Sequence, residues 1–234
     1  MLGILIAIAI SWLLLRLIEK KTLVVLGMCP VPKRLKQFSI GFLISAVCCI
    51  LIQYLEAYLK SSDWIFNKAI LSQTILHSFW WDFKSVLTEE LIFRGALLYI
   101  LIQKIGSNKS LLISAIAFGV YHWFSLGVIG NVVAMVLIFI GTGVMGYAWA
   151  LAFYKTKSIL LPFGLHLGWN FIHNTIFSQG PLGEMLLIAK GGHELTEWNS
   201  LLNFVSGMVI IPFLILIYVT YFVKKENDLN LTVN

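Results

Sequence analysis

Two adjacent carboxylates and an arginine stand close together in a stretch of the chain that is otherwise apolar. They are Glu89, Glu90 and Arg94, in the segment TEELIFRG at residues 88–95. A charged side chain inside a bilayer costs at least about 2.5 kcal/mol, so such residues need partners and usually serve a function. The candidate partners are His122, His166 and Asn170, which also lie in apolar sequence. Carboxylates, imidazoles and an amide in this setting indicate hydrolytic chemistry within a membrane.

Helix geometry gives the two carboxylates different roles. Glu90 and Arg94 stand at positions i and i+4, so on a helix they share a face and neutralise each other. Glu89 is rotated from Glu90 by about 100° and remains free to act as a base. A poorly solvated carboxylate is a stronger base near neutral pH than one in water. The alternative is a structural ion pair between helices, which explains Glu90 and Arg94 but leaves Glu89 unexplained.

The first candidate histidine, His122, ends the apolar segment that follows the glutamates. A short connection at residues 103–109 joins the two segments, so we expect them to pack as an antiparallel hairpin. Glu89 and His122 are similarly far from that connection, and at 1.5 Å rise per residue their depths agree to within about 3 Å. The hairpin therefore predicts that they approach each other. The alternative for His122 is a packing residue at the membrane interface.

A polar stripe marks a later apolar segment. His166, Asn170 and His173 stand at positions i, i+4 and i+7, which share one face of a helix. Such a stripe must face the bundle interior or a watery cavity. His166 and Asn170 can donate hydrogen bonds to an oxyanion, the charge that develops during acyl transfer. The alternative is that they join neighbouring helices, and we assign His173 to that packing or supporting role.

The composition is that of a membrane protein. Hydrophobic residues make up 59% of the 234 residues and charged residues 12%, whereas about a quarter of a soluble domain is charged. The net charge of +6 does not indicate nucleic-acid binding, because the basic residues stand between apolar runs, where they set orientation and contact anionic lipid. No polar linker divides the chain, so we predict a single membrane-embedded domain over residues 1–234.

The lengths of the apolar segments predict an all-α, polytopic transmembrane helix bundle. A bilayer core requires about 20 apolar residues in a helix. The candidate spans are residues 2–18, 38–59, 72–103, 110–124, 128–153, 158–178 and 201–223. We predict seven spans, with six and eight as the alternatives. The third segment is too long for one straight crossing, so it either begins as an interfacial helix or bends near the glutamate pair.

Lysine and arginine predict the orientation of this bundle. If the spans alternate, eleven basic residues fall on one side: Lys20, Lys21, Lys33, Arg34, Lys36, Lys104, Lys109, Lys155, Lys157, Lys224 and Lys225. Three fall on the other side: Lys60, Lys68 and Lys190. The positive-inside rule places the first group in the cytoplasm, with the C-terminus, and the N-terminus outside. Because basic residues follow the first span, we expect that span to be a retained signal anchor in the cell membrane.

Three motifs, in order and on separate membrane segments, resemble a known protein family. They are Glu89-Glu90-x-x-x-Arg94, Phe118-x-x-x-His122 and His166-x-x-x-Asn170. They resemble the signature motifs of the CAAX protease and bacteriocin-processing family, also called Abi, of intramembrane endopeptidases, which includes the type II CAAX prenyl endopeptidases. The similar core runs from about residue 71 to residue 177, which is a little under half of the chain.

The resemblance implies a protease whose active site lies within the bilayer. Glu89 would act as general base on a water molecule, assisted by His122. His166 and Asn170 would stabilise the tetrahedral oxyanion. The supporting residues implied by the motifs are Glu90, Arg94 and Phe118, of which the ion pair would position the site or engage the substrate.

The family is often labelled as metalloprotease, and this leaves two expectations for a cofactor. One glutamate and two histidines, here Glu89, His122 and His166, could hold zinc in an open site with three protein ligands. The helical H-E-x-x-H motif of zinc proteases is absent from the chain. We therefore expect no tightly bound metal, with zinc as the alternative.

Two classes of function follow from these observations. The first is an endopeptidase that cleaves a membrane-associated peptide or the tail of a lipidated protein. The second is a non-catalytic membrane protein that binds partners, as an immunity protein or as a scaffold that regulates a sensor. The intact set of Glu89, His122, His166 and Asn170 favours the first, because a scaffold has no need of buried charges.

The orientation can be tested with reporter fusions. We expect fusions in the segment 29–37, a predicted cytoplasmic surface loop, and at the C-terminus to report the cytoplasm. Fusions in the polar loop at 179–200 should report the opposite side, because few basic residues flank it. A cytoplasmic signal from 179–200 would mean that the number of spans differs from seven by one.

Overall fold

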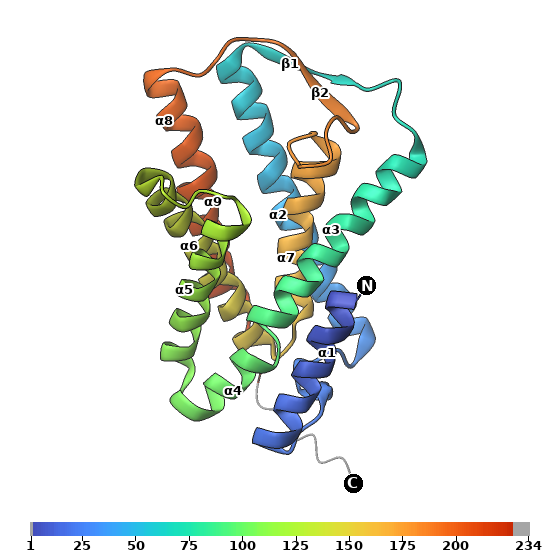
Figure 1. The fold of residues 1–234 in the computed structure, drawn as a ribbon, viewed down its shortest axis with the longest axis vertical. Coiled ribbons are helices and arrows are strands. Elements are labelled where there is room, and N and C mark those ends of the chain that lie inside the picture. Colours follow the sequence, from blue (N-terminus) through green and yellow to red (C-terminus); the bar gives the residue numbers. More distant parts are fainter. Residues whose placement is uncertain (1, 227–234) are drawn as a thin grey trace.

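A computed structural model describes residues 2–226 of the chain as a bundle of helices with a two-stranded sheet at one end (Figure 1). Four helical segments of this part are long and apolar enough to cross a bilayer: Leu2–Glu19, Val31–Lys60, Val132–Thr156 and Glu197–Phe222. The predicted all-α membrane helix bundle is therefore confirmed. The remaining helices lie among these four and carry most of the polar residues discussed above.

The helices, in chain order, are α1 (Leu2–Leu14), α2 (Val31–Lys60), α3 (Ser72–Phe93), α4 (Ala96–Ile105), α5 (Ser107–Ser125), α6 (Val132–Thr156), α7 (Leu160–Asn170), α8 (Glu197–Val205) and α9 (Ile211–Ile217). Wide, π-helical turns extend several of them: η1 (Leu15–Glu19), η3 (Phe171–Ile176), η4 (Ser206–Ile210) and η5 (Tyr218–Phe222). A 3-10 turn, η2 (Leu23–Leu26), and the strands β1 (Ser62–Phe66) and β2 (Leu187–Gly191) complete the fold.

The long third segment, residues 72–103, is two helices with a bend directly after the glutamate pair. Of the two alternatives, the bend is therefore correct. Gly95 permits it, because a Cβ at this position would lie 2.1 Å from the carbonyl oxygen of Leu91. The bend leaves the carbonyl group of Phe93 without a helical partner, and Ser114 Oγ on α5 donates a hydrogen bond to it at 3.0 Å. The bend thus also fixes α5 against the end of α3.

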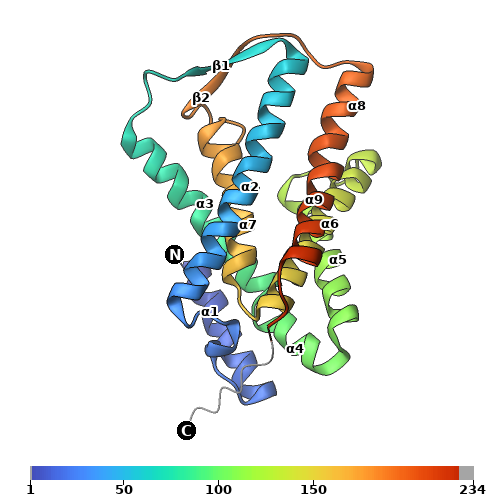
Figure 2. The same ribbon diagram turned by 180° about the vertical axis from the view of Figure 1, so that it is seen from behind.

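Two glycines bring α7 into backbone contact with α2, along which it runs in both views (Figures 1 and 2). A Cβ at Gly164 would lie 2.2 Å from the carbonyl oxygen of Phe38. A Cβ at Gly168 would lie 2.3 Å from that of Phe42. Small residues of this kind let membrane helices approach closely. His166 lies between the two glycines in sequence, so the contact sets its position in the bundle.

A two-stranded β-sheet built from distant segments covers one end of the bundle. β1 and β2 are antiparallel, and the register pairs Ser62 with Gly191 and Phe66 with Leu187. The predicted polar loop at 179–200 therefore contains a strand and the first residues of α8. Polar composition alone does not reveal a strand whose partner lies more than a hundred residues earlier.

The predicted surface loop at 29–37 is mostly helical, which corrects the start of the second span. α2 begins at Val31, with Pro32 in its first turn, where the missing N–H of proline costs no hydrogen bond. Counting apolar residues placed the start at residue 38, because it overlooks a polar first turn. That turn is held by contacts of Arg34 with other parts of the chain.

Arg34 is the centre of a polar cluster that we call the C-terminal clasp, made of Arg34, Gln37, Thr156 and Glu226. Arg34 is 1% exposed, and its Nη1 donates to the Thr156 carbonyl at 2.9 Å and to Glu226 at 3.2 Å. Gln37 Nε2 donates to Glu226 at 2.8 Å. The clasp therefore joins the start of α2, the end of α6 and the segment that follows η5.

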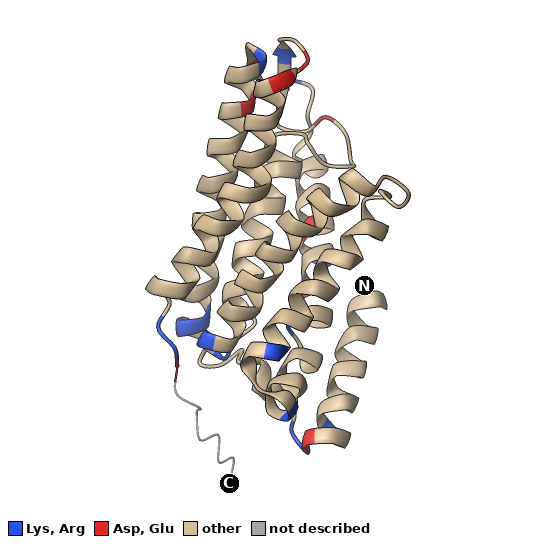
Figure 3. Ribbon diagram, turned by 90° about the vertical axis from the view of Figure 1, so that its left-hand side faces the viewer, with Lys and Arg blue, Asp and Glu red and all other residues tan. Residues whose placement is uncertain are grey.

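Basic residues gather at the clasp end of the bundle (Figure 3). The opposite end, which carries the two-stranded sheet, has both basic and acidic residues in the same view. The asymmetry that the sequence predicts is thus preserved when the helices pack, since the ends of α2, α4, α5 and α6 that carry these residues meet on one side.

The clasp predicts an acid-sensitive contribution to stability. Burial raises the pKa of the Glu226 carboxyl, but the hydrogen bond from Lys33, the charge of Arg34 and the hydrogen bond from Gln37 lower it more, so its pKa lies below the usual value. A depressed pKa means that the stabilisation is complete above the pKa of the unfolded chain and is lost as pH falls through the folded value. Glu226→Gln should lower stability by about 1–3 kcal/mol at neutral pH.

Thermal unfolding in detergent, followed from pH 7 downward, measures this effect. The wild-type protein should approach the stability of Glu226→Gln as the medium becomes acidic. Lys33→Gln is the matched control, because Lys33 contacts the same carboxylate at 2.8 Å but is 50% exposed, and such surface pairs contribute less than about 1 kcal/mol. An equal loss in both variants would contradict the role of buried Arg34.

Candidate active site

Buried charged and aromatic side chains from four helices meet inside the bundle. Glu90 comes from α3 and Arg94 directly follows it; Phe118 comes from α5, Trp149 from α6 and His166 from α7. Glu90 and Arg94 are 0% exposed and His166 is 4% exposed. Charges at this depth are stable only if they neutralise each other and are hydrogen-bonded.

Glu90 is the common acceptor of this cluster. Its Oε1 accepts a hydrogen bond from Arg94 Nη1 at 3.3 Å and one from His166 Nδ1 at 2.9 Å. The predicted i, i+4 ion pair is therefore present. Arg94 Nη2 also donates to the carbonyl oxygen of Gly146 on α6 at 3.4 Å. An ionised carboxylate only accepts, so Nδ1 of His166 carries a proton and its Nε2 points away from Glu90.

Glu89 lies on the other side of the His166 ring. Its Oε2 is 3.8 Å from Nε2 of His166, and its side chain is 14% exposed, whereas that of Glu90 is fully buried. The nearest hydroxyl is Ser85 Oγ, 3.5 Å from Glu89 Oε1. The ring of His166 is therefore flanked by two carboxylates, of which one is held by an arginine and the other is not.

Aromatic rings enclose the charged groups. Trp149 stacks on the His166 ring with centroids 4.1 Å apart. The guanidinium carbon of Arg94 lies 4.1 Å from the centroid of Phe118 and 5.0 Å from that of Trp149. Cation–π contacts and exclusion of water strengthen the ion pair that they surround. Phe118, which the second motif implied as a supporting residue, is 1% exposed and lies between the helices at this point.

His122 reaches the cluster through Phe118. Its Nδ1 donates to the carbonyl oxygen of Phe118 at 2.8 Å, because a carbonyl only accepts. The ring centroids of His122 and Phe118 are 4.4 Å apart, and the ring centroid of His166 lies 6.0 Å from that of Phe118. The remaining nitrogen of His122, Nε2, is thus an acceptor in the neutral ring. His122 and Glu89 were expected to approach each other. Their side chains form no direct hydrogen bond or ion pair within residues 2–226. His122 instead contacts Phe118, and Glu89 lies beside His166.

Asn170 stands one turn beyond His166 at the end of α7 and is partly buried. In the described part of the chain its side chain makes no hydrogen bond. The structure therefore gathers Glu89, Glu90, Arg94 and His166, places His122 beside them, and leaves the amide of Asn170 unengaged. Its role toward an oxyanion stays a prediction.

The three residues named for zinc do not fit a metal site. Among the residues that the structure describes, no three His, Cys, Asp or Glu side chains are placed to hold one metal ion. Glu89 and His166 approach each other, but His122 forms no hydrogen bond or ion pair with either of them in the described residues. We therefore derive no step through a metal.

Several polar atoms of the cluster have spare hydrogen-bonding capacity. Oε2 of Glu89, Oε2 of Glu90 and Nε of Arg94 are buried and have no hydrogen-bond partner in the described residues. Native proteins rarely leave such atoms unsatisfied, and those that remain often mark sites of ligand binding or catalysis. Donors and acceptors concentrated at one place in an apolar bundle can bind both water and a polypeptide backbone.

A second buried polar group on α3 was missed from the sequence. Asp82 is 0% exposed and accepts hydrogen bonds from Asn174 at 2.6 Å and from Thr175 at 3.1 Å. Ser78 is 2.7 Å from the Thr175 hydroxyl. The spacing in the sequence could have revealed this group. Polar residues recur at intervals of four, three and four, which places them on one face of a helix: Ser78, Asp82, Ser85 and Glu89. This face of α3 holds η3 and thereby the end of α7.

Trp149 was also missed, and in this case no signal was available. It lies within the apolar sequence of α6, where a tryptophan beside a buried charged cluster cannot be told from one that faces lipid. Only the packing of α6 against α7 places its ring on His166.

Comparison with known proteins supports the interpretation of this cluster. Residues 71–172 match a family described as Rce1-like, type II CAAX prenyl endopeptidase. The matched range begins where the similar core was predicted to begin, and it contains all three motifs. The family resemblance predicted from the motifs is therefore confirmed. No curated protein and no solved structure matches the chain.

The buried ion pair predicts different effects of removing one partner and of removing both. Arg94→Ala leaves Glu90 without its counter-charge, and breaking a buried pair costs about 3–5 kcal/mol. The double variant Glu90→Gln/Arg94→Met contains no unpaired charge and should recover most of that loss. Unfolding in detergent measures both. Equal destabilisation by the single and double variants would mean that Arg94 acts through its packing against Phe118 and Trp149 rather than through its charge.

Proposed function

We propose that this protein is an intramembrane endopeptidase that hydrolyses a peptide bond in a membrane-associated peptide or lipidated protein. The observation that carries the proposal is the placement of Glu89 Oε2 3.8 Å from Nε2 of His166, whose other nitrogen is held by Glu90. A carboxylate that no lysine or arginine holds, beside a ring oriented by a second carboxylate, is the arrangement of a base and an oriented acid. The family match supports a CAAX-type membrane protease in general terms.

Glu89 is the general base in this mechanism. A water molecule bound by the Glu89 carboxylate and by Nε2 of His122 transfers a proton to Glu89 while its oxygen attacks the carbonyl carbon. The tetrahedral intermediate that forms carries the negative charge on the former carbonyl oxygen. When it collapses, the C–N bond breaks and Glu89 returns its proton to the leaving nitrogen. Each proton is thus accounted for without a metal or a second base.

His166 and Asn170 stabilise the oxyanion. Nδ1–H of His166 already donates to Glu90, so a second proton on Nε2 makes the ring a cation that donates on both sides. With His166 in this form, Glu89 and Glu90 contribute two negative charges and Arg94 and His166 two positive charges. The cluster is then neutral as a whole, which is the least costly state inside an apolar bundle. The free amide of Asn170 supplies the second donor.

The supporting residues hold this arrangement in place. The Glu90–Arg94 pair fixes the tautomer and the orientation of His166, as an aspartate does for histidine in hydrolases with a catalytic triad. The rings of Phe118 and Trp149 restrict water around the pair.

The basic end of the bundle, which contains the C-terminal clasp, faces the cytoplasm in this proposal. Its support is the distribution of lysine and arginine along the chain and in the fold (Figure 3). The two-stranded sheet then lies on the other side of the membrane. The partners of the protein are the lipid bilayer and a membrane-associated substrate, and no nucleic acid is involved.

The catalytic role of Glu89 is separable from folding. Glu89→Gln keeps the shape of the side chain and removes its basicity, so cleavage should fall by at least about 100-fold while the protein still accumulates in the membrane. Comparing the membrane peptidomes of cells that express wild-type protein or Glu89→Gln identifies the affected peptides. Purified protein in vesicles then gives the rates, and we expect EDTA to leave them unchanged.

Two results would contradict the proposal. Near wild-type cleavage by Glu89→Gln would exclude Glu89 as the base. A partner-dependent function that survives alanine at Glu89, His122 and His166 together would identify the protein as a non-catalytic scaffold instead. The variant Ser72→Ala, at the exposed start of α3 and far from the cluster, is the control for expression and handling.

A further inference from the structure

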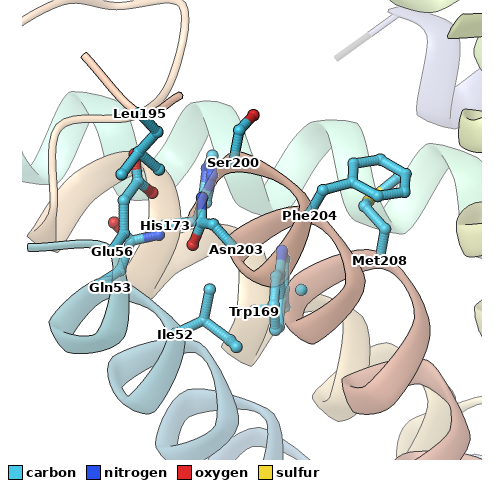
Figure 4. Close-up of a pocket in the computed structure, with 11 residues that line it drawn as sticks. Ile52, Gln53, Glu56, Trp169, His173, Leu195, Ser200, Asn203, Phe204 and Met208 are labelled. Carbon is cyan, nitrogen blue, oxygen red and sulfur yellow. The ribbon is translucent and has the colours of Figure 1, made fainter. Parts of the chain in front are cut away.

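A second site lies beyond the candidate active site along α7 and η3, toward the end of the bundle that carries β1 and β2. It is a pocket of about 300 Å³ between α2, η3 and the α8–η4 segment (Figure 4). α2 and the α8–η4 segment lie outside the residues that match the family. Trp169 and His173 line the pocket from the helix that carries His166. This pocket shares no lining residue with the candidate active site.

Unsatisfied acceptors line one side of the pocket. Gln53 is 2% exposed, and its Oε1 is buried with no hydrogen-bond partner in the part of the chain described. The same holds for Oδ1 of Asn203 on α8. A buried oxygen without a partner is unfavourable, so two of them in one pocket point to a ligand that donates hydrogen bonds.

His173 adds a further acceptor. Nδ2 of Asn174 donates to Asp82 at 2.6 Å, so Oδ1 of Asn174 is left to accept. His173 Nδ1 is 3.1 Å from that oxygen and must therefore be the donor. In the neutral ring Nε2 is then an acceptor. The chain of hydrogen bonds from α3 thus sets the tautomer of a residue that lines the pocket.

A carboxylate completes the polar side. Glu56 lines the pocket, and its Oε1 is 2.6 Å from Lys60 Nζ. Lys60 is 34% exposed and does not line the pocket, so this surface pair is weak and leaves the second carboxylate oxygen available. Figure 4 shows Gln53, Glu56, His173 and Asn203 on one side of the pocket, and Trp169, Phe204 and Met208 on the other.

The apolar side suits the stem of a long side chain. Trp169 offers an aromatic face, and Phe204 and Met208 offer flexible apolar surface. A lysine or arginine side chain combines an aliphatic stem with a cationic, hydrogen-bond-donating end, and it stacks favourably on tryptophan. An acidic or acceptor-only side chain would leave both amide oxygens unsatisfied.

We propose that this pocket binds a lysine or arginine side chain of the substrate and thereby selects the peptides that are cleaved. The inference rests on the proposed function. His173 is seven residues beyond His166, which is about 10 Å along the helix. An extended peptide covers that distance in about three residues. The basic residue should therefore stand about three positions from the scissile bond.

Cleavage-site profiling tests this preference. Full-length protein in phosphatidylglycerol vesicles, which carry no ammonium headgroup, is incubated with a proteome-derived peptide library, and the cut positions are read by mass spectrometry. Peptides found to be cut are then resynthesised in pairs with lysine or its neutral analogue norleucine at the selected position. We expect the wild-type protein to cut the lysine member faster by roughly tenfold, the effect of one hydrogen bond to a charged group.

Matched variants assign that preference to the pocket. Glu56→Gln and Gln53→Leu should bring the lysine-to-norleucine ratio close to one. Asp63→Asn removes an exposed carboxylate from β1 at the same end of the molecule, outside this pocket, and should leave the ratio unchanged. Cleavage without any basic preference would overturn the inference while the proposed function stands.

A readout that needs no catalysis covers the case in which nothing is cut. With Cys29, Cys48 and Cys49 replaced by alanine, Ser200→Cys places a thiol in the pocket. Its reaction with the cationic 2-aminoethyl methanethiosulfonate should be favoured over that with the anionic 2-sulfonatoethyl reagent, relative to exposed Ser125→Cys. Glu56→Gln should reduce this bias. Equal bias at both positions would show that the pocket does not prefer cations, whatever the fate of the proposed function.

Discussion

Charge balance in an apolar interior is the constraint on which this structure depends. Glu90 and Arg94 are fully buried, and neither can be accommodated there alone. The pair is linked to the end of α3. That helix ends at Phe93, and the bend at Gly95 leaves Arg94 beside α6, where it donates to the carbonyl oxygen of Gly146. The pair also determines what must surround it, since Phe118 and Trp149 contact the guanidinium. His166 and Glu89 are then added to a framework that already has one cation and one anion.

The local parts of this arrangement could be predicted from the sequence. The Glu90–Arg94 pair follows from a spacing of four on a helix, and a bend near the glutamates follows from the excessive length of the segment 72–103. The membrane helices follow from apolar length. Such features depend on neighbours in the chain, whose geometry is set by the helix itself.

The parts that depend on packing between distant segments could not be predicted. The predicted antiparallel packing of two helices favoured His122 as the neighbour of Glu89, whereas the imidazole that lies beside Glu89 is that of His166. The bend after α3 changes the direction of the chain before the turn to α5, so equal depth along two helices no longer implies contact. The strand pairing of residues 62–66 with 187–191 has no local signal either, because each strand is short and its partner is remote.

The contact between α2 and α7 has a further consequence for how the imidazole of His166 is held. Gly164 and Gly168 allow the backbone of α7 to lie directly against the carbonyl groups of Phe38 and Phe42. His166 lies between these two glycines in the sequence. An added methyl group at either glycine would displace the whole helix, and hydrolytic groups lose efficiency when they move by even about 1 Å. In the proposed mechanism, the position of the His166 imidazole is thus set by a contact between two helix backbones, and loss of activity without loss of folding would be the mark of a change there.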